Sequence, residues 1–254
     1  GSMTVGGDAG TLTAGSDFNG VGSISVGGDL GSITAGDSIA IDVSAGGDLG
    51  TITAGTEITA DVTVGEDLGT LTAPTMSGDL SAGGGLTTLD ITGDFSGSID
   101  VGGSATTLNA GGGFTGSGTI AIGGNMGTMT AGTEIAVDVS VGVDAGTITA
   151  PKMSGDLYVY DDMSNFNVDD MTGTITGGSN HNSINTGDSG ETISTGDGND
   201  YIQSNGGDDV IDAGSGNDTI VGGSGDDTID GGDGTDTVSY TDIDSGGVQI
   251  DLEA

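Results

Sequence analysis

The sequence predicts an all-β protein, a right-handed parallel β-solenoid (β-helix) in which short strands stack coil upon coil. Composition is the first observation behind this prediction. The 254 residues include 56 glycines but only four phenylalanines, four tyrosines and no tryptophan, which is too few large side chains for a compact globular core. A solenoid needs only a thin, continuous core. The second and third observations are two internal repeats, one of 18 to 21 residues and one of nine.

The longer repeat occupies residues 3–158, and its copies resemble VGGDLGSITAG in their first eleven residues. Apolar and polar residues alternate along each copy, which favours strands over helices. We expect two strands in each coil. Ile52 is an example of the inward residue of the T-x-T strand, Val62 of the second strand, and Ile58 of the bend between them. The copies begin at Val5, Val26, Ala45, Val64, Ala82, Val101, Ile122 and Val141.

The shorter repeat fills residues 177–239 with seven uninterrupted nonapeptides, among them TGDGNDYIQ and SNGGDDVID. The eighth place of each nonapeptide is a large aliphatic residue. An acidic, disordered linker is the alternative interpretation. A linker, however, gives no reason for an aliphatic residue at every ninth position. The sixth places are Asn182, Glu191, Asp200, Asp209, Asp218, Asp227 and Asp236.

Residues 159–176 form a transition coil between the two arrays. Phe166 and Ile175 already occupy eighth places of the nonapeptide frame, so we expect the long coils to continue into the short coils without a linker. Residues 240–254 follow the last nonapeptide. Val248, Ile250 and Leu252 alternate there with polar residues, which predicts a terminal strand or an incomplete coil.

The nonapeptide array resembles the RTX, or hemolysin-type, calcium-binding repeat, written G-G-x-G-x-D-x-U-x with U a large aliphatic residue. This resemblance implies a calcium-binding β-roll, in which two nonapeptides form one coil. The sixth-place residues would then stack along two edges. The first carboxylate edge would contain Asn182, Asp200, Asp218 and Asp236, and the second carboxylate edge would contain Glu191, Asp209 and Asp227.

The resemblance also implies that each calcium ion lies between turns of neighbouring coils. Sixth-place carboxylates and backbone carbonyls would hold about five Ca²⁺ ions, because calcium prefers oxygen ligands. Asn182 and Glu191 depart from aspartate, which places the two most N-terminal sites in question. The turn glycines assigned to these sites are Gly196, Gly198, Gly207, Gly214, Gly216, Gly223, Gly225, Gly232 and Gly234.

The formal charge of −38 restricts the possible partners, since Lys152 is the only lysine or arginine. Such a charge argues against nucleic acid and anionic membranes as partners and favours divalent cations. No apolar run is long enough to insert across a bilayer, and the absence of cysteine excludes disulfides. We expect no enzyme activity, because Lys152 and His181 are the only candidate basic groups and nothing in the sequence brings them together.

Three ladders in the long array leave alternatives open. Paired threonines, such as Thr51/Thr53 and Thr70/Thr72, resemble the ice-binding face of several β-solenoid antifreeze proteins. Threonine is also simply a favourable residue on an exposed strand. Turn aspartates such as Asp29, with Asp61 and its equivalents on the second strand, could bind further calcium. We favour solvated carboxylates, with the turn aspartates hydrogen-bonded to their own backbone.

These features predict a calcium-binding structural segment of a secreted or cell-surface bacterial protein, such as a surface-layer, adhesin-stalk or matrix component. The RTX resemblance implies an extracellular location, type I secretion and folding on external calcium. Self-association and a cell-surface polysaccharide are further candidate interactions. The alternative functions are an ice-binding β-solenoid and the non-catalytic region of a polysaccharide-modifying enzyme.

Overall fold

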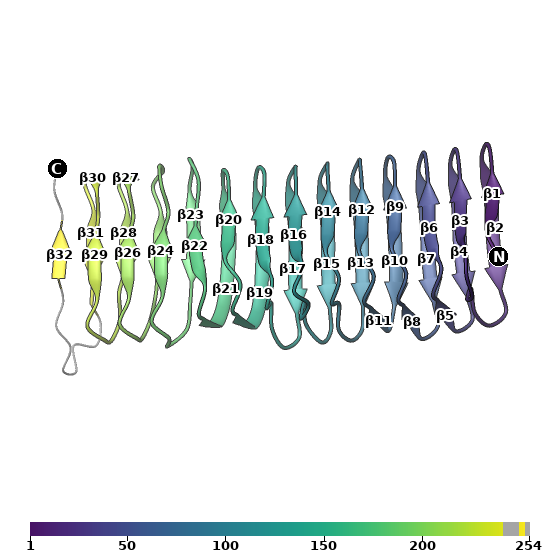
Figure 1. Cartoon of the computed structure of the whole chain (residues 1–254). Helices are drawn as coiled ribbons and strands as arrows, with labels where there is room; N and C mark the ends of the chain where they lie inside the picture. The colour runs from purple at the N-terminus through teal and green to yellow at the C-terminus, as the bar shows by residue number, and fades with distance from the viewer. Residues whose placement is uncertain (241–248, 252–254) are drawn as a thin grey trace. The chain divides into compact units, whose positions relative to one another are not determined.

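The chain is described by a computed structural model that covers residues 1–240 and 249–251. All regular secondary structure in these residues is β. Accordingly, no helix in the described part of the chain could cross a membrane. The chain forms two compact units, Gly1–Gly132 and Thr133–Ala254, which divide within the long repeats. Each unit is a parallel β-solenoid, as the sequence predicts (Figure 1).

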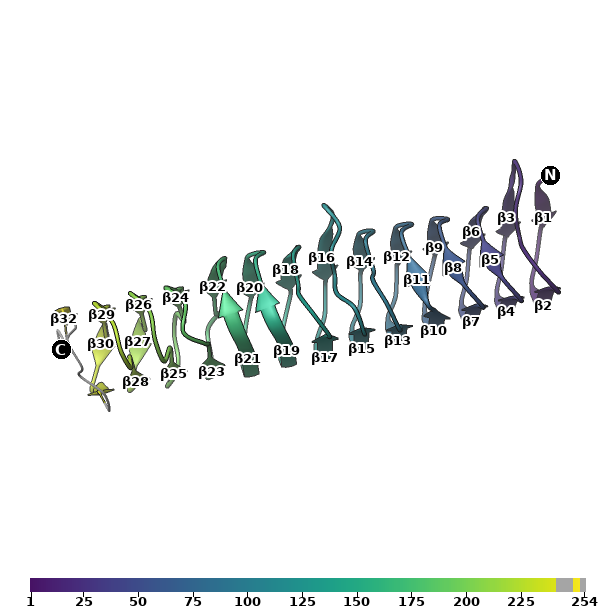
Figure 2. The same cartoon turned by 90° about the horizontal axis from the view of Figure 1, so that it is seen from below.

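Unit 1 contains two parallel sheets that form two layers in Figure 2. The T-x-T sheet consists of β2 (Ala9–Ala14), β4 (Leu30–Ala35), β7 (Leu49–Ala54), β10 (Leu68–Ala73), β13 (Leu86–Ile91), β15 (Ala105–Ala110) and β17 (Met126–Ala131). The opposite sheet consists of β1 (Met3–Val5), β3 (Ser23–Val26), β6 (Asp42–Ala45), β9 (Val62–Val64), β12 (Leu80–Ala82), β14 (Ile99–Val101) and β16 (Thr119–Ile122).

The bend between the two sheets of unit 1 also pairs from coil to coil. The sequence pattern predicts only an apolar stack here, but the structure adds a small sheet of β5 (Ser38–Ile39), β8 (Glu57–Ile58) and β11 (Thr75–Met76) (Figure 2). Phe95 and Phe114 extend this column through single bridges. Their ring centroids lie 5.9 Å apart at an interplanar angle of 53°, a tilted aromatic contact.

The core of unit 1 contains the three apolar stacks that the period-two pattern predicts. Ile52, Ile58 and Val62 represent these stacks, and each is fully buried. The first residue of the T-x-T strand is buried as well, as in Leu49 and Leu68, and this fourth stack was not predicted. Because full burial of one such side chain stabilises by roughly 1.5–3 kcal/mol, each long coil contributes several such increments.

Outward residues of the T-x-T sheet align across unit 1. Thr51 pairs in register with Thr70, and Thr53 pairs with Thr72, so the threonines form two straight columns. Asp90 and Asn109 interrupt one column and hydrogen-bond to each other, with 2.7 Å between Asn109 Nδ2 and Asp90 Oδ1. The threonine ladder is therefore a regular outward surface with one polar interruption.

Unit 2 begins with long coils and ends with nonapeptide coils (Figure 1). Its T-x-T sheet continues into the nonapeptides as β19 (Ala145–Met153), β21 (Met163–Met171), β23 (Asn182–Asn185), β25 (Tyr201–Gln203), β28 (Thr219–Val221) and β31 (Thr237–Ser239). The opposite sheet consists of β18 (Asp138–Val141), β20 (Leu157–Val159), β22 (Thr174–Thr176), β24 (Thr192–Ser194), β26 (Val210–Asp212), β29 (Thr228–Asp230) and β32 (Gln249–Asp251).

The two kinds of coil join through direct strand pairing in unit 2. Phe166 of the transition coil pairs with Ile184 of the first nonapeptide, and Ile175 pairs with Ile193. An irregularity between Met163 and Phe166 accommodates the change of coil shape. The boundaries of the four predicted segments remain predictions. At the C-terminal end, Ile250 pairs with Ile229 through β32, whereas Val248 and Leu252 lie outside the described residues.

Candidate metal centre

Turns of the nonapeptide coils depend on glycine at the second and fourth places. All nine glycines predicted at the metal sites have positive φ, between 76° and 144°. At Gly216, φ is 143°, and a Cβ atom would collide with the carbonyl oxygen of Gly198 in the preceding coil. Glycine is required there by both backbone conformation and close stacking. Asn205 takes the second place of its nonapeptide with a φ of 66°, which asparagine tolerates better than most residues.

Eighth-place aliphatic residues form the thin core between the two carboxylate edges. Ile184, Ile202 and Ile220 pair in register in the T-x-T sheet, and Ile193 and Ile211 do so in the opposite sheet. All five are at most 1% exposed. This parallel register also aligns the sixth places two residues earlier, because successive coils are offset by 18 residues.

The sixth-place side chains are buried, and the structure arranges them along the two predicted edges. Asp200, Asp209, Asp218 and Asp227 are only 1–2% exposed, as are Asn182 and Glu191. Asp236 is half-buried. Carboxylates are rarely buried to this degree unless a cation or hydrogen bonds compensate for lost hydration.

One oxygen of each buried aspartate accepts a hydrogen bond from the coil before it. Asp218 Oδ1 lies 2.7 Å from the backbone nitrogen of Asp200, which donates. Asp236 Oδ1 accepts from the backbone nitrogen of Asp218 in the same way at 2.9 Å. On the second carboxylate edge, Asp209 and Asp227 repeat this contact towards the preceding coil. Each carboxylate is thus oriented by the backbone of its neighbour.

The second oxygen of each buried carboxylate has no hydrogen-bond partner among the described residues. These oxygens are Oδ2 of Asp200, Asp209, Asp218 and Asp227, joined by Oε1 of Glu191 and Oδ1 of Asn182. A buried polar atom without a partner loses its hydration without compensation, which costs about 1–3 kcal/mol and more for a charged group. The unpartnered oxygens therefore mark positions where a cation would stabilise the fold.

Burial raises the pKa of several of these carboxyl groups above the usual range. Desolvation is the largest cause for Asp200, Asp209 and Asp218. Glu191 shifts furthest, because burial and then the carboxylate of Asp209 raise its pKa to about 9. The folded nonapeptide coils therefore favour protons or metal ions at these positions.

Calcium fits this set of donors better than a softer metal, because every available atom is an oxygen. No group of three histidine or acidic side chains within the described residues could hold a metal alone. Carboxylates from two successive coils, such as Asp200 and Asp218, would therefore share an ion with backbone carbonyls. Turn carbonyls such as that of Gly198, which lies close to the turn at Gly216, are the candidates for this role. A bound dication would neutralise the carboxylates that face it.

First-place residues of the nonapeptides supply buried hydroxyls on both carboxylate edges, and sequence reasoning missed them. Thr195 and Ser204 are fully buried, and their hydroxyls donate to the carbonyls of Ala213 and Gly222 in the next coil, both at 2.9 Å. Thr186 donates to Glu191 Oε2 at 3.1 Å. A short hydroxyl can be buried when the next coil offers a carbonyl, so its polarity alone is a poor guide to exposure.

Tyr240 is a further missed residue, because it lies just after the last nonapeptide. Its phenol oxygen is buried and has no hydrogen-bond partner among the described residues. Burial raises the pKa of Tyr240 to about 12, and the carboxylates of Asp227 and Asp209 contribute to this rise. The side chain therefore reaches the second carboxylate edge.

Turn aspartates of unit 1 have a different environment from the sixth-place residues. Asp29 Oδ1 accepts a hydrogen bond from the backbone nitrogen of Asp48 at 3.0 Å, and Asp48 repeats the contact with Asp67. Asp61 on the second strand bonds to the nitrogen of Asp79 at 2.9 Å. All five of these side chains are exposed, so water can hydrate the remaining oxygens. Their exposure agrees with the prediction of solvated carboxylates. The prediction that the turn aspartates bond to their own backbone is wrong, because these hydrogen bonds run to the backbone of the next coil.

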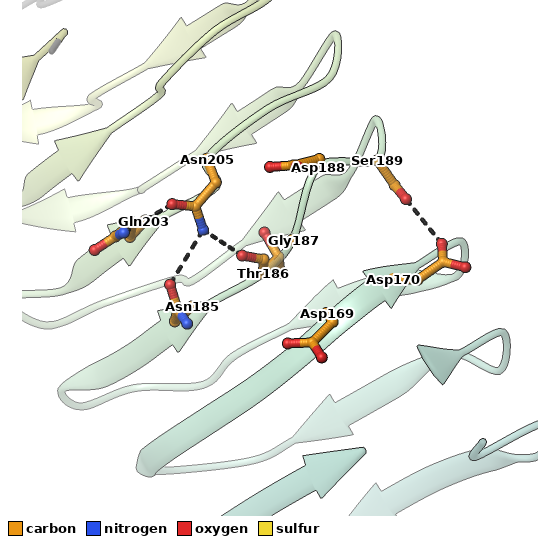
Figure 3. A pocket seen from close by; sticks show the side chains of 9 residues that line it. All are labelled: Asp169, Asp170, Asn185, Thr186, Gly187, Asp188, Ser189, Gln203 and Asn205. Carbon is orange, nitrogen blue, oxygen red and sulfur yellow. Dashed lines mark hydrogen bonds between the residues drawn. The ribbon is translucent and has the colours of Figure 1, made fainter. Parts of the chain in front are cut away.

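A polar cavity of about 590 Å³ opens where the transition coil meets the nonapeptides (Figure 3). Ser189 donates to Asp170 Oδ1 at 2.8 Å, and Gln203 donates to Asn205 Oδ1 at 2.7 Å. Asp169 also lines the cavity but is exposed, unlike the buried sixth-place residues. The cavity is therefore a polar surface feature that borders the N-terminal end of the second carboxylate edge, because Thr186 both lines it and donates to Glu191 Oε2. His181, also exposed, does not line it.

Comparison with known families agrees with this geometry. The family model of the RTX calcium-binding nonapeptide repeat (4 copies) matches residues 170–202, 185–220 and 212–240. This part of the chain therefore consists of RTX calcium-binding repeats, and the predicted resemblance is confirmed. Neither a curated protein nor a solved structure matches the chain. RTX repeats are typical of secreted proteins, and the number of bound ions remains a prediction.

Replacing Asp218 by asparagine should raise the calcium midpoint several-fold and reduce the number of ions bound. Asp218 lies between Asp200 and Asp236, so its carboxylate would contribute to two successive sites. Asp212→Asn is the matched control, because it removes the same charge from an exposed side chain, where single charges contribute little. Calorimetric calcium titration measures both quantities. Equal effects of the two substitutions would contradict the assignment of Asp218 as a ligand.

In the presence of a chelator, lowering the pH should stabilise the folded nonapeptide coils and so partly take the place of calcium. The raised pKa values of Asp200, Asp209, Asp218 and Glu191 mean that the folded state binds more protons than the unfolded state. Their stabilisation is complete below the unfolded pKa of about 4. This stabilisation is lost as the pH rises through the pKa values of the folded state. For Glu191 the pKa in the folded state is about 9.

Circular dichroism in chelator should therefore show more β-structure at about pH 5 than at about pH 8. Glu191→Gln, which resembles the protonated acid, should reduce this pH dependence. A β-signal that is stronger at the higher pH would contradict the buried position of these carboxyl groups.

Proposed function

We propose that the chain is a non-catalytic, calcium-dependent structural segment of a secreted or cell-surface protein. Its RTX coils would fold when they meet external calcium and would then extend or hold other parts of that protein. The observation that supports this most strongly is the set of buried, unpartnered oxygens along the two carboxylate edges. A single lysine in the whole chain cannot neutralise them.

Electrostatics explain why such coils would respond to calcium. Two carboxylates about 5 Å apart repel by roughly 3 kcal/mol at an effective dielectric constant near 20. A divalent ion between them reverses the sign of the interaction. Extracellular calcium sites typically bind at about 0.1–1 mM, so the same coils would be unfolded at cytosolic calcium levels and folded outside the cell.

The expected stabilisation is large enough to control folding. At ten times the dissociation constant, one site adds about 1.4 kcal/mol by linkage. Five independent sites would add roughly 7 kcal/mol, which is comparable to the stability of a whole domain. Each of the first six nonapeptides buries one large aliphatic residue, so little other stabilisation is available to them.

Chelation should unfold residues 177–239 and leave unit 1 folded. Hydrogen exchange in chelator should show protection across residues 5–132, where the turn aspartates hydrogen-bond to backbone and several apolar stacks are buried. Residues 177–239 should exchange rapidly until millimolar calcium is added. Protection that does not respond to calcium would contradict the proposal. Loss of protection in unit 1 would assign calcium to its aspartates as well.

Ice binding is the second candidate function, because the threonine columns of unit 1 are in register and face outward. The protein should then show thermal hysteresis. Replacing Thr51 and Thr53 with lysine should abolish it without changing calcium binding. Hysteresis that is absent from the calcium-loaded protein would eliminate this candidate and leave the structural proposal intact.

A further inference from the structure

On the second carboxylate edge, the first-place residues of successive coils stack in a column. The type of residue in this column changes towards the C-terminal end. Thr186 and Ser204 open successive coils of this edge with buried hydroxyls. The next first-place residue is Gly222, which has no side chain. Tyr240 stands 18 residues after Gly222, at the corresponding place of the following coil. Gly222 therefore has no side-chain hydroxyl to bury, but a residue of a neighbouring coil can place an oxygen there.

The phenol of Tyr240 reaches back to Gly222. A Cβ atom built on Gly222 would lie 3.1 Å from Tyr240 Oη and 2.9 Å from Tyr240 Cε1. The same point lies 2.9 Å from Asp227 Oδ2. Two oxygens from successive coils therefore face one small volume beside the glycine.

Neither of these oxygens has a hydrogen-bond partner among the described residues, although both are buried. The other carboxylate oxygen, Asp227 Oδ1, is already occupied by the backbone nitrogen of Asp209 at 3.0 Å. Leaving a hydroxyl and a carboxylate oxygen buried and unsatisfied at the same place is costly. One cation between them would satisfy both.

We propose that Tyr240 Oη and Asp227 Oδ2 bind the same divalent cation, so that the phenol is a ligand of the last metal site on the second carboxylate edge. This proposal rests on the calcium-binding function proposed above. A neutral phenol oxygen has lone pairs available for a metal. Calcium accepts six to eight oxygen ligands at about 2.3–2.6 Å, a range that two oxygens flanking one point can meet.

Glycine at position 222 is part of the same site. Its φ lies outside the positive region, so an alanine would fit the backbone, and Ala213 holds the equivalent first place on the other edge. The added methyl group would instead occupy the volume between Asp227 and Tyr240. Gly222→Ala should therefore weaken this one metal site without removing any ligand.

Terbium, a luminescent substitute for calcium, provides the test on the whole chain. The protein has four tyrosines and no tryptophan, so terbium emission excited through the protein reports nearby tyrosine. Tyr240→Phe should remove most of this emission and weaken or eliminate one calcium in a calorimetric titration. Tyr201→Phe is the matched control, because Tyr201 follows the sixth-place Asp200 but is 43% exposed. It should leave calcium affinity and ion count unchanged.

A second pair of variants keeps the tyrosine and changes the carboxylate. Asp227→Asn should reduce the emission as strongly as Tyr240→Phe, whereas Asp218→Asn on the first carboxylate edge should retain most of it. Circular dichroism in calcium checks that each variant still folds. Wild-type emission and ion count in Tyr240→Phe would overturn the proposal and leave Tyr240 as a packing residue. Absence of terbium and calcium binding in every variant and in the wild type would overturn the calcium function itself.

Discussion

The burial of carboxylates without protein cations is the constraint on which the nonapeptide coils depend. Asp200, Asp209, Asp218 and Asp227 lie within the wall of the solenoid at 1–2% exposure. Backbone nitrogens of the preceding coils satisfy one oxygen of each, and the second oxygen has no partner among the described residues. Because the chain has a single lysine and no arginine, the compensating charge must come from outside it. Under the proposed function, folding and cation binding are two aspects of one equilibrium.

Long coils avoid this dependence although they share the same parallel backbone. Their turn aspartates, such as Asp29 and Asp48, also bond to the backbone of a neighbouring coil, but they remain exposed and hydrated. Their interior is filled by stacks such as those of Ile52 and Leu49. A nonapeptide strand buries one aliphatic residue, for example Ile202. The thinner the apolar core, the more of the stability must come from ions.

Sequence spacing predicted the fold because a parallel solenoid converts periodicity directly into neighbours. A repeat of 18 residues places Ile202 beside Ile220, and the same offset places Asp200 beside Asp218. The pattern also predicted the turn glycines, since positive φ and close stacking are properties of backbone position. It did not predict the buried hydroxyls of Thr195 and Ser204, because their burial depends on a carbonyl of the next coil. Nor did it specify which carboxylate oxygen is left without a partner.

The hydrogen bonds along the carboxylate ladder all point in one direction along the chain. The two ends of the ladder are therefore not equivalent. Each sixth-place carboxylate reaches to the preceding coil, so every coil is completed by the one that follows it. Asp227 is the last sixth-place carboxylate assigned to the second edge. Tyr240 follows the last nonapeptide, and its phenol brings a buried oxygen from the following segment towards the unpartnered oxygen of Asp227. Each coil depends on a side chain of the coil that follows it, so a different residue is needed where the nonapeptide pattern changes. Tyr240 meets this need with an oxygen on a large apolar ring.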